Sequence, residues 1–291
     1  MAGQDKLLEP IREIVDKAAS NYGEHAEIES CSKIPDPGDI PQRKNKWLRL
    51  DDVISVFVDM KGSTKLSSKK HPKSTAEIYQ YFTDTVVRIC NHLGAAYLDI
   101  KGDGIFALFD KNTPHAALCA AVTCKTFAND YFSPQVTKRR DVDVGVHIGI
   151  DCGPIVFKRI GLEPRRGADD SGKRNEVWAG KCVNMSSKLA ALGDDNELKI
   201  SSRFFDRLTH RKALKSCGCD SSNGAATNLW EPKDVTDDFF DFKRVYTLRS
   251  NWCDTHGKEY CDELLKSENE ELKEALSRDG TGLLSFLDWD D

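Results

Sequence analysis

Hydrophobic and polar positions follow two different periods along the central part of the chain. The run from Val53 to Val58 is almost wholly apolar, which is typical of a buried strand. Between residues 75 and 93 apolar side chains recur every third or fourth position, and this spacing predicts a helix. Residues 95–100 and 105–109 follow as two predicted strands. The turn between them, Lys101-Gly102-Asp103-Gly104, has two glycines and suits a hairpin.

The next segment adds a second helix and a fourth strand. Residues 114–127 have a helical apolar pattern, with Pro114 in the first turn. Residues 142–150 have apolar side chains at alternate positions, and residues 155–157 continue the predicted strand. The order strand, helix, hairpin, helix, strand is the βαββαβ plan of a ferredoxin-like α+β sandwich. We expect its helices on one face of an antiparallel sheet.

The flanking segments divide the chain into three expected parts. Residues 1–50 combine an amphipathic helix with an extended, proline-containing lead-in, and residues 51–250 form the main domain. Residues 251–291 form a helical tail, whose apolar end at 283–289 is expected to dock on the domain or on a partner chain. The later part of the main domain adds helices at 183–192 and 202–209 and strands at 198–201 and 242–248.

Composition narrows the classes of function. With 39% hydrophobic and 31% charged residues the chain is an ordinary globular protein. Its formal net charge is -5 and it has no long basic block, which disfavours a nucleic-acid partner. The longest apolar runs have the length of a strand, so no membrane association is expected. Residues 1–10 lack the apolar core of a signal peptide, and a cytoplasmic protein is expected.

The ten cysteines fall into groups with different expected roles. Cys90, Cys119 and Cys124 lie in helical apolar patterns and are expected to be buried thiols. A second group has side chains that can bind zinc: His210, Cys217, Cys219, Cys253, His256 and Cys261. Its spacing fits no common zinc finger, which favours a loop with free thiols over a metal site.

Two aspartates are the first candidates for chemistry. Asp59 ends the first strand, before a Gly-Ser-Thr turn whose N–H groups and hydroxyls suit phosphates. Asp103 lies in the hairpin tip, and the first and third strands of a ferredoxin-like sheet are neighbours, so we expect Asp59 and Asp103 to meet. Either residue alone is better interpreted as a helix cap or a turn residue. Together they predict a site for Mg²⁺ or Mn²⁺.

Asn184 and Lys188 are four residues apart on a predicted helix and therefore share one face. An amide and a cation on one face suit a ribose and a triphosphate. Taken alone, these two residues would be a solvated polar face.

Four segments together resemble the class III adenylate and guanylate cyclase domain, over about residues 52–208. They are 59–64, the hairpin 101–103, 149–153 and 178–188. The whole chain is similar to the bacterial pyrimidine cyclases of the Pycsar antiphage systems. Those are stand-alone domains with a proline-containing lead-in before an Asp-Met-Lys-Gly-Ser-Thr motif. The resemblance implies a class III cyclase sandwich with helical extensions at both ends.

The resemblance also implies a role for each motif. Asp59 and Asp103, assisted by the carbonyl of Met60, would hold two divalent metal ions, Mn²⁺ or Mg²⁺. Asn184 would orient the ribose, and Lys188 would act on the reacting phosphate where the family usually has an arginine. The phosphates would lie on Lys61, Gly62, Ser63 and Thr64. The implied assembly is a homodimer with composite sites, metals from one chain and Asn184 and Lys188 from the other.

The positions that read the base depart from those of purine cyclases. The lysine and aspartate pair that reads adenine is absent, and the first position is Asp99, with Tyr97 two residues before it. The second position falls at Glu176 or Val177. A bulky Tyr97 or Trp178 would shrink the pocket to fit a pyrimidine. The alternative is that both aromatic side chains belong to the core.

These observations predict a pyrimidine nucleotide cyclase that converts UTP to 3',5'-cyclic UMP and diphosphate. The resemblance implies that the product is a second messenger in antiphage defence, read by a separate cyclic-nucleotide-gated effector. Three alternatives stay open: a cytidylate cyclase, a purine (adenylate) cyclase, and a non-catalytic nucleotide-binding module.

Overall fold

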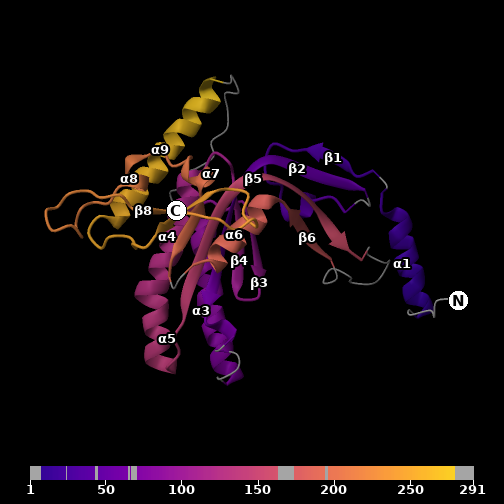
Figure 1. Cartoon of the computed structure of the whole chain (residues 1–291), viewed down its shortest axis with the longest axis horizontal. Coiled ribbons are helices and arrows are strands. Elements are labelled where there is room, and N and C mark those ends of the chain that lie inside the picture. The colour runs from indigo at the N-terminus through magenta and orange to yellow at the C-terminus, as the bar shows by residue number, and fades with distance from the viewer. Residues whose placement is uncertain are drawn as a thin grey trace.

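A mixed β-sheet is the centre of the protein (Figure 1). The computed structural model describes residues 8–23, 25–42, 45–64, 66, 71–162, 174–193 and 196–278. The strand order is β3-β4-β2-β5-β7-β9-β8, with β1 paired to β2 and β6 paired to β5. The described strands are β1 (Glu27–Ser30), β2 (Lys46–Lys61), β3 (Tyr97–Lys101), β4 (Gly104–Phe109), β5 (Gly145–Gly161), β6 (Arg174–Ala179), β7 (Leu198–Ser201), β8 (Trp230–Asp234) and β9 (Arg244–Leu248).

Four strands of the sheet, with the two helices between them, confirm the βαββαβ plan. Along the chain, β2, α3 (Pro72–His92), β3, β4, α4 (Pro114–Thr126) and β5 follow one another. The antiparallel order β3-β4-β2-β5 makes the first and third strands of the plan neighbours, as expected. The sheet as a whole is mixed, because β1 runs parallel to β2 and β7 runs parallel to β5. The four strands of the plan are antiparallel, as expected, and the parallel pairs involve strands outside the plan.

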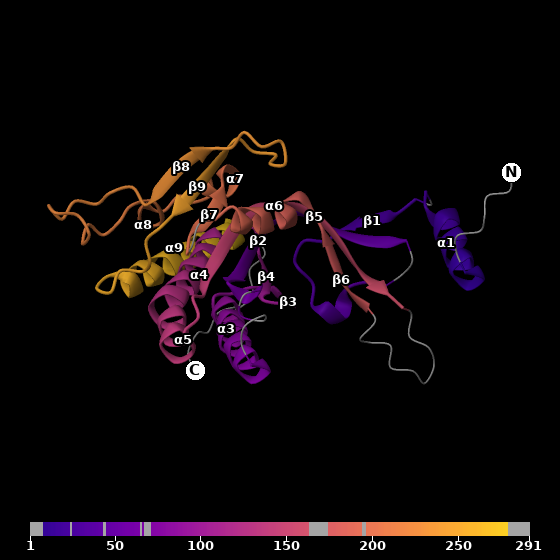
Figure 2. The ribbon, with the colours of Figure 1, turned by 60° about the horizontal axis from the view of Figure 1, so that its bottom comes forward.

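Helices lie on both faces of the sheet, and alternate side chains of β2 contact them. Ile54, Val56 and Val58 belong to the main core together with α3 and α4. Ser55 points to the opposite face, where its hydroxyl lies 2.7 Å from that of Ser186 on α6 (Lys181–Ala191). Figure 2 shows α6 across the sheet from α3 and α4. The two helices of the plan, α3 and α4, thus share one face as expected, and α6 adds a second helical layer on the other.

Gly149 allows this second layer to approach closely. A Cβ atom at Gly149 would lie 1.9 Å from the carbonyl oxygen of Ser186, so α6 packs directly on the β5 backbone. The close approach fixes the height of α6 above the sheet. It therefore also positions Asn184, which α6 carries.

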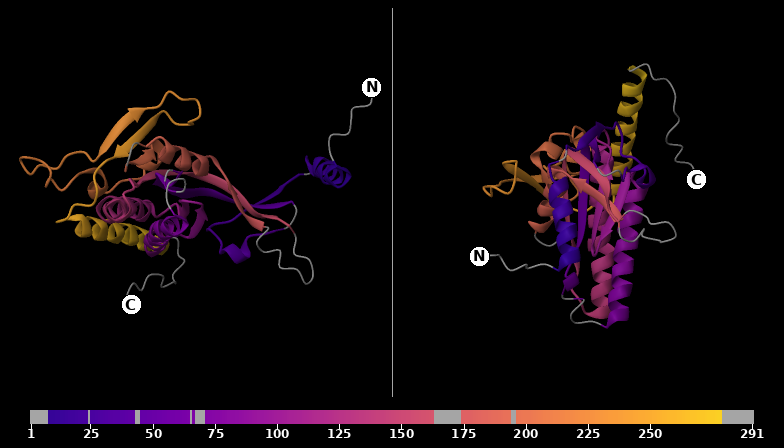
Figure 3. Two further views of the ribbon diagram at one scale, coloured as in Figure 1. Left: turned by 90° about the horizontal axis from the view of Figure 1, so that it is seen from below. Right: turned by 90° about the vertical axis from the view of Figure 1, so that its right-hand side faces the viewer.

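Strands β2 and β5 extend past the main core and form an arm with β1 and β6 (Figure 2). The arm has a second apolar core, made of Ile40, Leu50, Val53, Tyr97, Phe106, Leu108, Ile155, Phe157 and Cys182. Helix α1 (Glu9–Asn21) has no buried residue and lies at the far end of this arm (Figure 3). The predicted N-terminal helix is confirmed, while β1 and the 3-10 turn Pro37–Asp39 replace part of the predicted connector.

Several boundaries differ from the sequence prediction. Strand β5 runs unbroken over Gly145–Gly161, and it begins later than predicted because the chain first ends α5 (Ser133–Arg140) at Asp141, with φ 52°. The helix predicted over 202–209 is shorter, α7 (Ser202–Phe205), and α8 (Arg211–Leu214) follows. Strands β6 and β8 and the π-helix at Phe127–Phe132 were not predicted.

Helix α9 (Gly257–Arg278) confirms the predicted C-terminal helix and docks on the main domain. The carboxylate of Glu268 accepts hydrogen bonds from the backbone nitrogens of His115 (2.6 Å) and Ala116 (3.1 Å), at the start of α4. The apolar segment 283–289, predicted to dock, lies outside the described residues. No helix in the described part of the chain combines the length and apolarity that a bilayer span needs.

Candidate active site

Asp59 and Asp103 meet at the end of β2, as the topology predicts. Asp59 lies opposite Gly104 in the β2–β4 ladder, and the amide nitrogen of Met60 donates a 3.3 Å hydrogen bond to the carbonyl oxygen of Asp103. A Cβ atom at Gly104 would lie 3.1 Å from Oδ1 of Asp59, so the glycine lets the hairpin tip sit against the carboxylate. Burial, followed by the negative charge of Asp103, raises the pKa of Asp59 to about 6. A bound divalent cation would relieve both costs, so this pair fits the expected metal ions.

The turn after Asp59, predicted to bind phosphates, is a tight glycine turn that leads into a short helical segment. Gly62 has φ +86°, and a Cβ atom there would lie 2.7 Å from the carbonyl oxygen of Asp143. Only glycine fits this position without strain. Ser63 and Thr64 then begin a helical turn, in which the N–H of Leu66 donates to the carbonyl of Gly62 (2.9 Å). The Nζ atom of Lys61 lies 3.8 Å from the Asp143 carboxylate.

A cavity of about 250 Å³ lies between the hairpin, β6 and α6. Most of the residues predicted to read the base line this cavity, and so does Asn184. Asp99 and Lys101 share one face of β3 and form an ion pair of 2.6 Å at its wall. The lining residues are Phe57, Asp99, Lys101, Phe106, Glu176, Trp178, Val183, Asn184 and Ser187. Three aromatic rings and a set of charged and amide groups suit a flat heterocycle.

Trp178 serves the core and the cavity at once. Its ring stacks on Phe157 at 4.4 Å between centroids, and Tyr97 packs on it at 4.5 Å. Its buried Nε1 atom has no hydrogen-bond partner among the described residues. Tyr97 itself is 6% exposed, and burial raises its pKa to about 12. Trp178 thus lines the cavity, whereas Tyr97 supports it from behind.

Glu176 is held in a fixed orientation at the cavity wall. Arg159 donates to its carboxylate from Nε (2.9 Å) and from a terminal nitrogen (2.6 Å). The Tyr97 hydroxyl makes a long third contact of 3.5 Å. Of the two positions that the sequence left open, Glu176 lines the cavity, while Val177 alternates to the other side of β6.

Asn184 and Lys188 lie one helical turn apart on α6 but have different surroundings. Asn184 is exposed and lines the cavity. The Nζ atom of Lys188 donates to the carbonyl oxygen of Phe239 (3.3 Å) and lies 5.0 Å from the centre of its ring. Lys188, Asp59 and Asp103 are not among the described residues that line the cavity. The carboxylate pair borders the cavity without lining it, because Gly104 packs against both the ring of Phe57, which lines the cavity, and the carboxylate of Asp59.

Sequence reasoning missed a buried acid beside this site. Asp151 on β5 is fully buried and accepts hydrogen bonds from Ser201 (2.5 Å) and from Nε of Arg203 (2.7 Å). Arg203 also binds Asp241 through two 3.0 Å contacts. The carboxylate of Asp241 in turn lies 3.5 Å from Nζ of Lys181, at the start of α6. An acid in an otherwise apolar strand was the signal available in the sequence.

Comparison with known proteins assigns the family. The profile of the adenylate and guanylate cyclase catalytic domain matches residues 46–223. The chain belongs to this family. It is 32% identical over 258 residues to a uridylate cyclase of Micromonospora echinofusca, covering 86% of this chain and 81% of that protein. It is 34% identical over 237 residues to a uridylate cyclase of Propioniciclava tarda, covering 79% of this chain and 74% of that protein. The predicted enzyme class, a nucleotidyl cyclase, is confirmed.

Solved structures show the same fold. The adenylyl cyclase CyaB from P. aeruginosa superposes with a TM-score of 0.56 at 14% identity, covering 70% of this chain and 96% of that one. The guanylyl cyclase Cya2 superposes with a TM-score of 0.54 at 17% identity, covering 69% of this chain and 91% of that one. The predicted α+β class III cyclase sandwich is therefore confirmed.

Proposed function

We propose that this cyclase converts UTP to 3',5'-cyclic UMP and diphosphate. The observation that carries the proposal is the small cavity, with a carboxylate and an ammonium side by side at its wall. Uracil presents the N3 proton next to the O4 acceptor, and the Asp99–Lys101 pair offers the complementary acceptor and donor. The similarity to two uridylate cyclases over most of the chain supports the same substrate.

The cavity walls also disfavour a purine. Trp178 is fixed between Phe157 and Tyr97, so it yields little space to a larger base. Glu176, held by Arg159, provides a second acceptor whose position is set before substrate arrives. A preorganised polar wall rejects a base with the wrong donor pattern strongly, because its buried groups would be left unpaired.

We assign the metal ions to the carboxylate pair. Asp59, Asp103 and the carbonyl of Met60 would hold two Mn²⁺ or Mg²⁺ ions, which activate the ribose 3'-hydroxyl and neutralise the leaving diphosphate. The turn from Lys61 to Thr64 would bind the phosphate oxygens through N–H groups and hydroxyls.

We assign the complete site to a homodimer. Asn184 would hold the ribose and Lys188 would stabilise charge on the reacting phosphate, both facing the carboxylate pair of the partner chain. The membership in the adenylate and guanylate cyclase family supports this arrangement. Each dimer would then have two composite sites.

Incubation with ATP, GTP, CTP and UTP in the presence of Mn²⁺, with mass spectrometry of the products, tests the substrate. We expect cyclic UMP as the dominant product. Dominant cyclic CMP would favour the cytidylate alternative, in line with a cytidylate cyclase of Escherichia coli that is 26% identical over 180 residues. Dominant cyclic AMP would overturn the pyrimidine assignment. Binding of triphosphates without turnover would indicate a nucleotide-binding module.

We propose further that cyclic UMP made in the cytoplasm acts as a second messenger in antiphage defence, read by a separate cyclic-nucleotide-gated effector. The resemblance to Pycsar cyclases supports this role. Phage challenge of cells that carry the chain with its genomic neighbours, compared with the Asp59→Ala variant, tests it. Equal phage titres on both strains would contradict the proposal.

A further inference from the structure

Three thiols and one imidazole converge at the junction between a surface loop and helix α9. Cys217 and Cys219 lie in the loop of residues 215–229, between α8 and β8, and Cys253 and His256 immediately precede α9. One potential ligand atom from each of the four lies within 4.8 Å of all the others. The Nδ1 atom of His256 is 3.2 Å from Sγ of Cys219 and 3.9 Å from Sγ of Cys253.

These distances suit a tetrahedral metal ion. With zinc–sulfur bonds of about 2.3 Å and zinc–nitrogen bonds of about 2.0 Å, the ligand atoms of a tetrahedral site lie roughly 3.5 Å apart. The observed cluster closes to that size with small side-chain movements. Three thiolates and one imidazole also complete the ligand shell, which is typical of structural zinc sites and leaves no position for a substrate.

The structure separates these four residues from two others of the same chemical type. His210 accepts a hydrogen bond from the backbone nitrogen of Lys212 (3.2 Å) and begins α8. The thiol of Cys261 is hydrogen-bonded to that of the buried Cys119, and both cysteines are free. The spacing of the remaining four, Cys-x-Cys followed by Cys-x-x-His, explains why the sequence alone favoured a loop with free thiols.

The backbone around the cluster directs the thiols inward. Gly218 has φ +89°, and a Cβ atom there would lie 2.3 Å from the carbonyl oxygen of Gly224, so the turn between the first two cysteines requires glycine. The backbone N–H groups of Thr255 and His256 donate to Sγ of Cys253. Such N–H donors stabilise a metal-bound thiolate.

The loop of residues 215–229 has little else to hold it in place. Its residues 222–228 are all exposed, and its described contacts are mainly hydrogen bonds within the loop, such as Ser216 N to Thr227 O (2.9 Å) and Ser221 N to Gly218 O (3.0 Å). A segment without an apolar core needs a cross-link to keep one conformation. A metal ion at the cluster would supply that cross-link.

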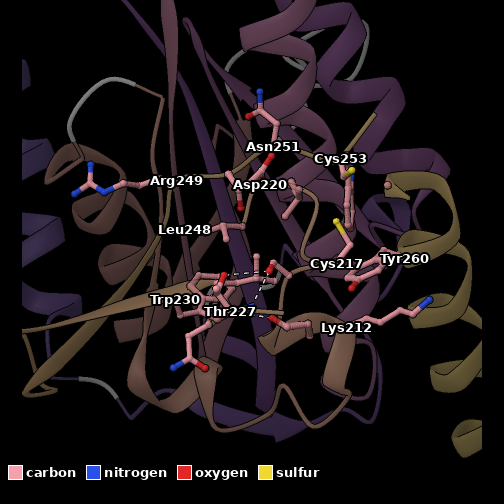
Figure 4. Close-up of a pocket in the computed structure, with 18 of the residues that line it drawn as sticks. Lys212, Cys217, Asp220, Thr227, Trp230, Leu248, Arg249, Asn251, Cys253 and Tyr260 are labelled. Atoms are coloured by element: carbon pink, nitrogen blue, oxygen red, sulfur yellow. Dashed lines mark hydrogen bonds between the residues drawn. The ribbon is translucent and has the colours of Figure 1, made fainter. Parts of the chain in front are cut away.

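We propose that Cys217, Cys219, Cys253 and His256 bind one structural Zn²⁺ ion, which joins the 215–229 loop to the N-terminal end of α9. Figure 4 shows Cys217 and Cys253 at the edge of a cavity of about 290 Å³, near Tyr260. The ion would fix this wall of the cavity. It would also fix the start of the helix whose Glu268 holds α4.

Zinc content of the full-length protein tests the proposal. The protein is purified under reducing conditions without added chelator, and metals are measured by mass spectrometry. Variants Cys219→Ser and His256→Asn each remove one ligand. Cys31→Ser is the matched control, because Cys31 directly follows β1, outside the cluster, and its thiol donates to the carbonyl oxygen of Arg49 (3.3 Å). We expect about one zinc per chain in wild type and in Cys31→Ser, and at least a fivefold lower content in the other two.

Cobalt substitution tests the geometry on the wild-type fold itself. After zinc is removed with a mercurial reagent and a chelator, added Co²⁺ should give the intense visible bands of a tetrahedral site and a thiolate charge-transfer band. Addition of Zn²⁺ should remove both. Zinc-poor wild-type protein that gives only the weak bands of octahedral Co²⁺ would overturn the proposal. So would equal zinc content in wild type and in Cys219→Ser.

Discussion

Asp103 lies beside Asp59, with its backbone carbonyl bonded to the amide that follows Asp59 in the chain. The two carboxylates are therefore held together by the β2–β4 pairing and not by attraction between the side chains. Burial and the charge of Asp103 both raise the pKa of Asp59, to about 6. A protein that keeps two repelling acids in one place gains from a divalent cation between them.

Replacing either acid should abolish turnover. Asp59→Ala and Asp103→Ala each remove a predicted metal ligand, and we expect a loss of at least about a thousandfold in kcat with UTP and Mn²⁺. Asp84→Ala is the matched control, since Asp84 is an exposed acid on α3 that pairs with Arg88 at 3.1 Å, one helical turn away. Turnover within tenfold of wild type in either site variant would contradict the metal assignment.

Asp59 should also make the stability of the metal-free protein depend on pH. Its pKa is raised to about 6 in the folded chain, against about 4 in an unfolded one, so the folded state binds this proton more tightly. Ionisation of Asp59 therefore lowers the free energy of unfolding. This loss is absent below pH 4, grows between pH 4 and 6, and is complete above pH 6. Asp59→Asn should therefore raise Tm more at pH 8 than at pH 5. Mn²⁺ should raise Tm of wild type at pH 8 and leave the variant unchanged, whereas equal Tm differences at both pH values would contradict this prediction.

The order of strands and helices could be predicted from the sequence because apolar residues recur with a clear strand or helix period in the core elements. Val53–Val58 is apolar apart from Ser55, and Ile78, Phe82 and Val86 recur at four-residue steps on the buried side of α3. The meeting of Asp59 and Asp103 followed from strand order alone. Strands with little apolar signal were missed: β1 is exposed throughout, and β8 has one buried residue.

Groups of side chains that only tertiary contacts bring together were harder to predict from the sequence. The second helical layer depends on Gly149, whose role appears only when α6 lies against it. Lys101 was read as part of a turn, although it faces the cavity beside Asp99. The two halves of the cysteine cluster are separated by the whole β8–β9 hairpin. Local periodicity carries no information on such contacts.

The cavity wall predicts how base selection can be altered. Trp178→Ala enlarges the site, and we expect the ratio of kcat/KM for UTP over ATP to fall by about tenfold to a hundredfold, mainly through slower UTP turnover. Trp178→Phe keeps the stacking on Phe157 and should retain most of the preference. Competition assays with both substrates and Mn²⁺ measure the ratio. An unchanged ratio in Trp178→Ala would show that this ring belongs to the core only.

Mixing two inactive variants tests the composite dimer. Asp59→Ala lacks the carboxylate pair and Asn184→Ala lacks the ribose contact, so each homodimer is inactive. A mixed dimer has one site with both defects and one intact site. Equal mixing should therefore restore about a quarter of wild-type activity. Mixing Asp59→Ala with Asp103→Ala is the control and should restore nothing, because both defects then fall on the same half of the site. No recovery in the first mixture, with subunit exchange shown by mass spectrometry, would contradict the dimer proposal.

Glu268 should decide how firmly the C-terminal helix is attached. Its carboxylate is almost fully buried and accepts the N–H groups of His115 and Ala116, which would otherwise lack acceptors at the start of α4. Glu268→Ala should lower the free energy of unfolding by about 1–3 kcal/mol in urea titrations, and Glu268→Gln by less, since the amide retains one acceptor oxygen.

The matched control for this cap lies half a turn away on the same helix. Glu270 is exposed and pairs with Lys266 at 4.0 Å, so Glu270→Ala should change the stability by less than about 0.5 kcal/mol. Limited proteolysis gives an independent readout, because cleavage within α9 should become faster in Glu268→Ala while the main domain stays resistant. Equal stability of the Glu268→Ala and Glu270→Ala variants would mean that α9 is held by its apolar contacts, such as those of the buried Leu264, and not by the cap.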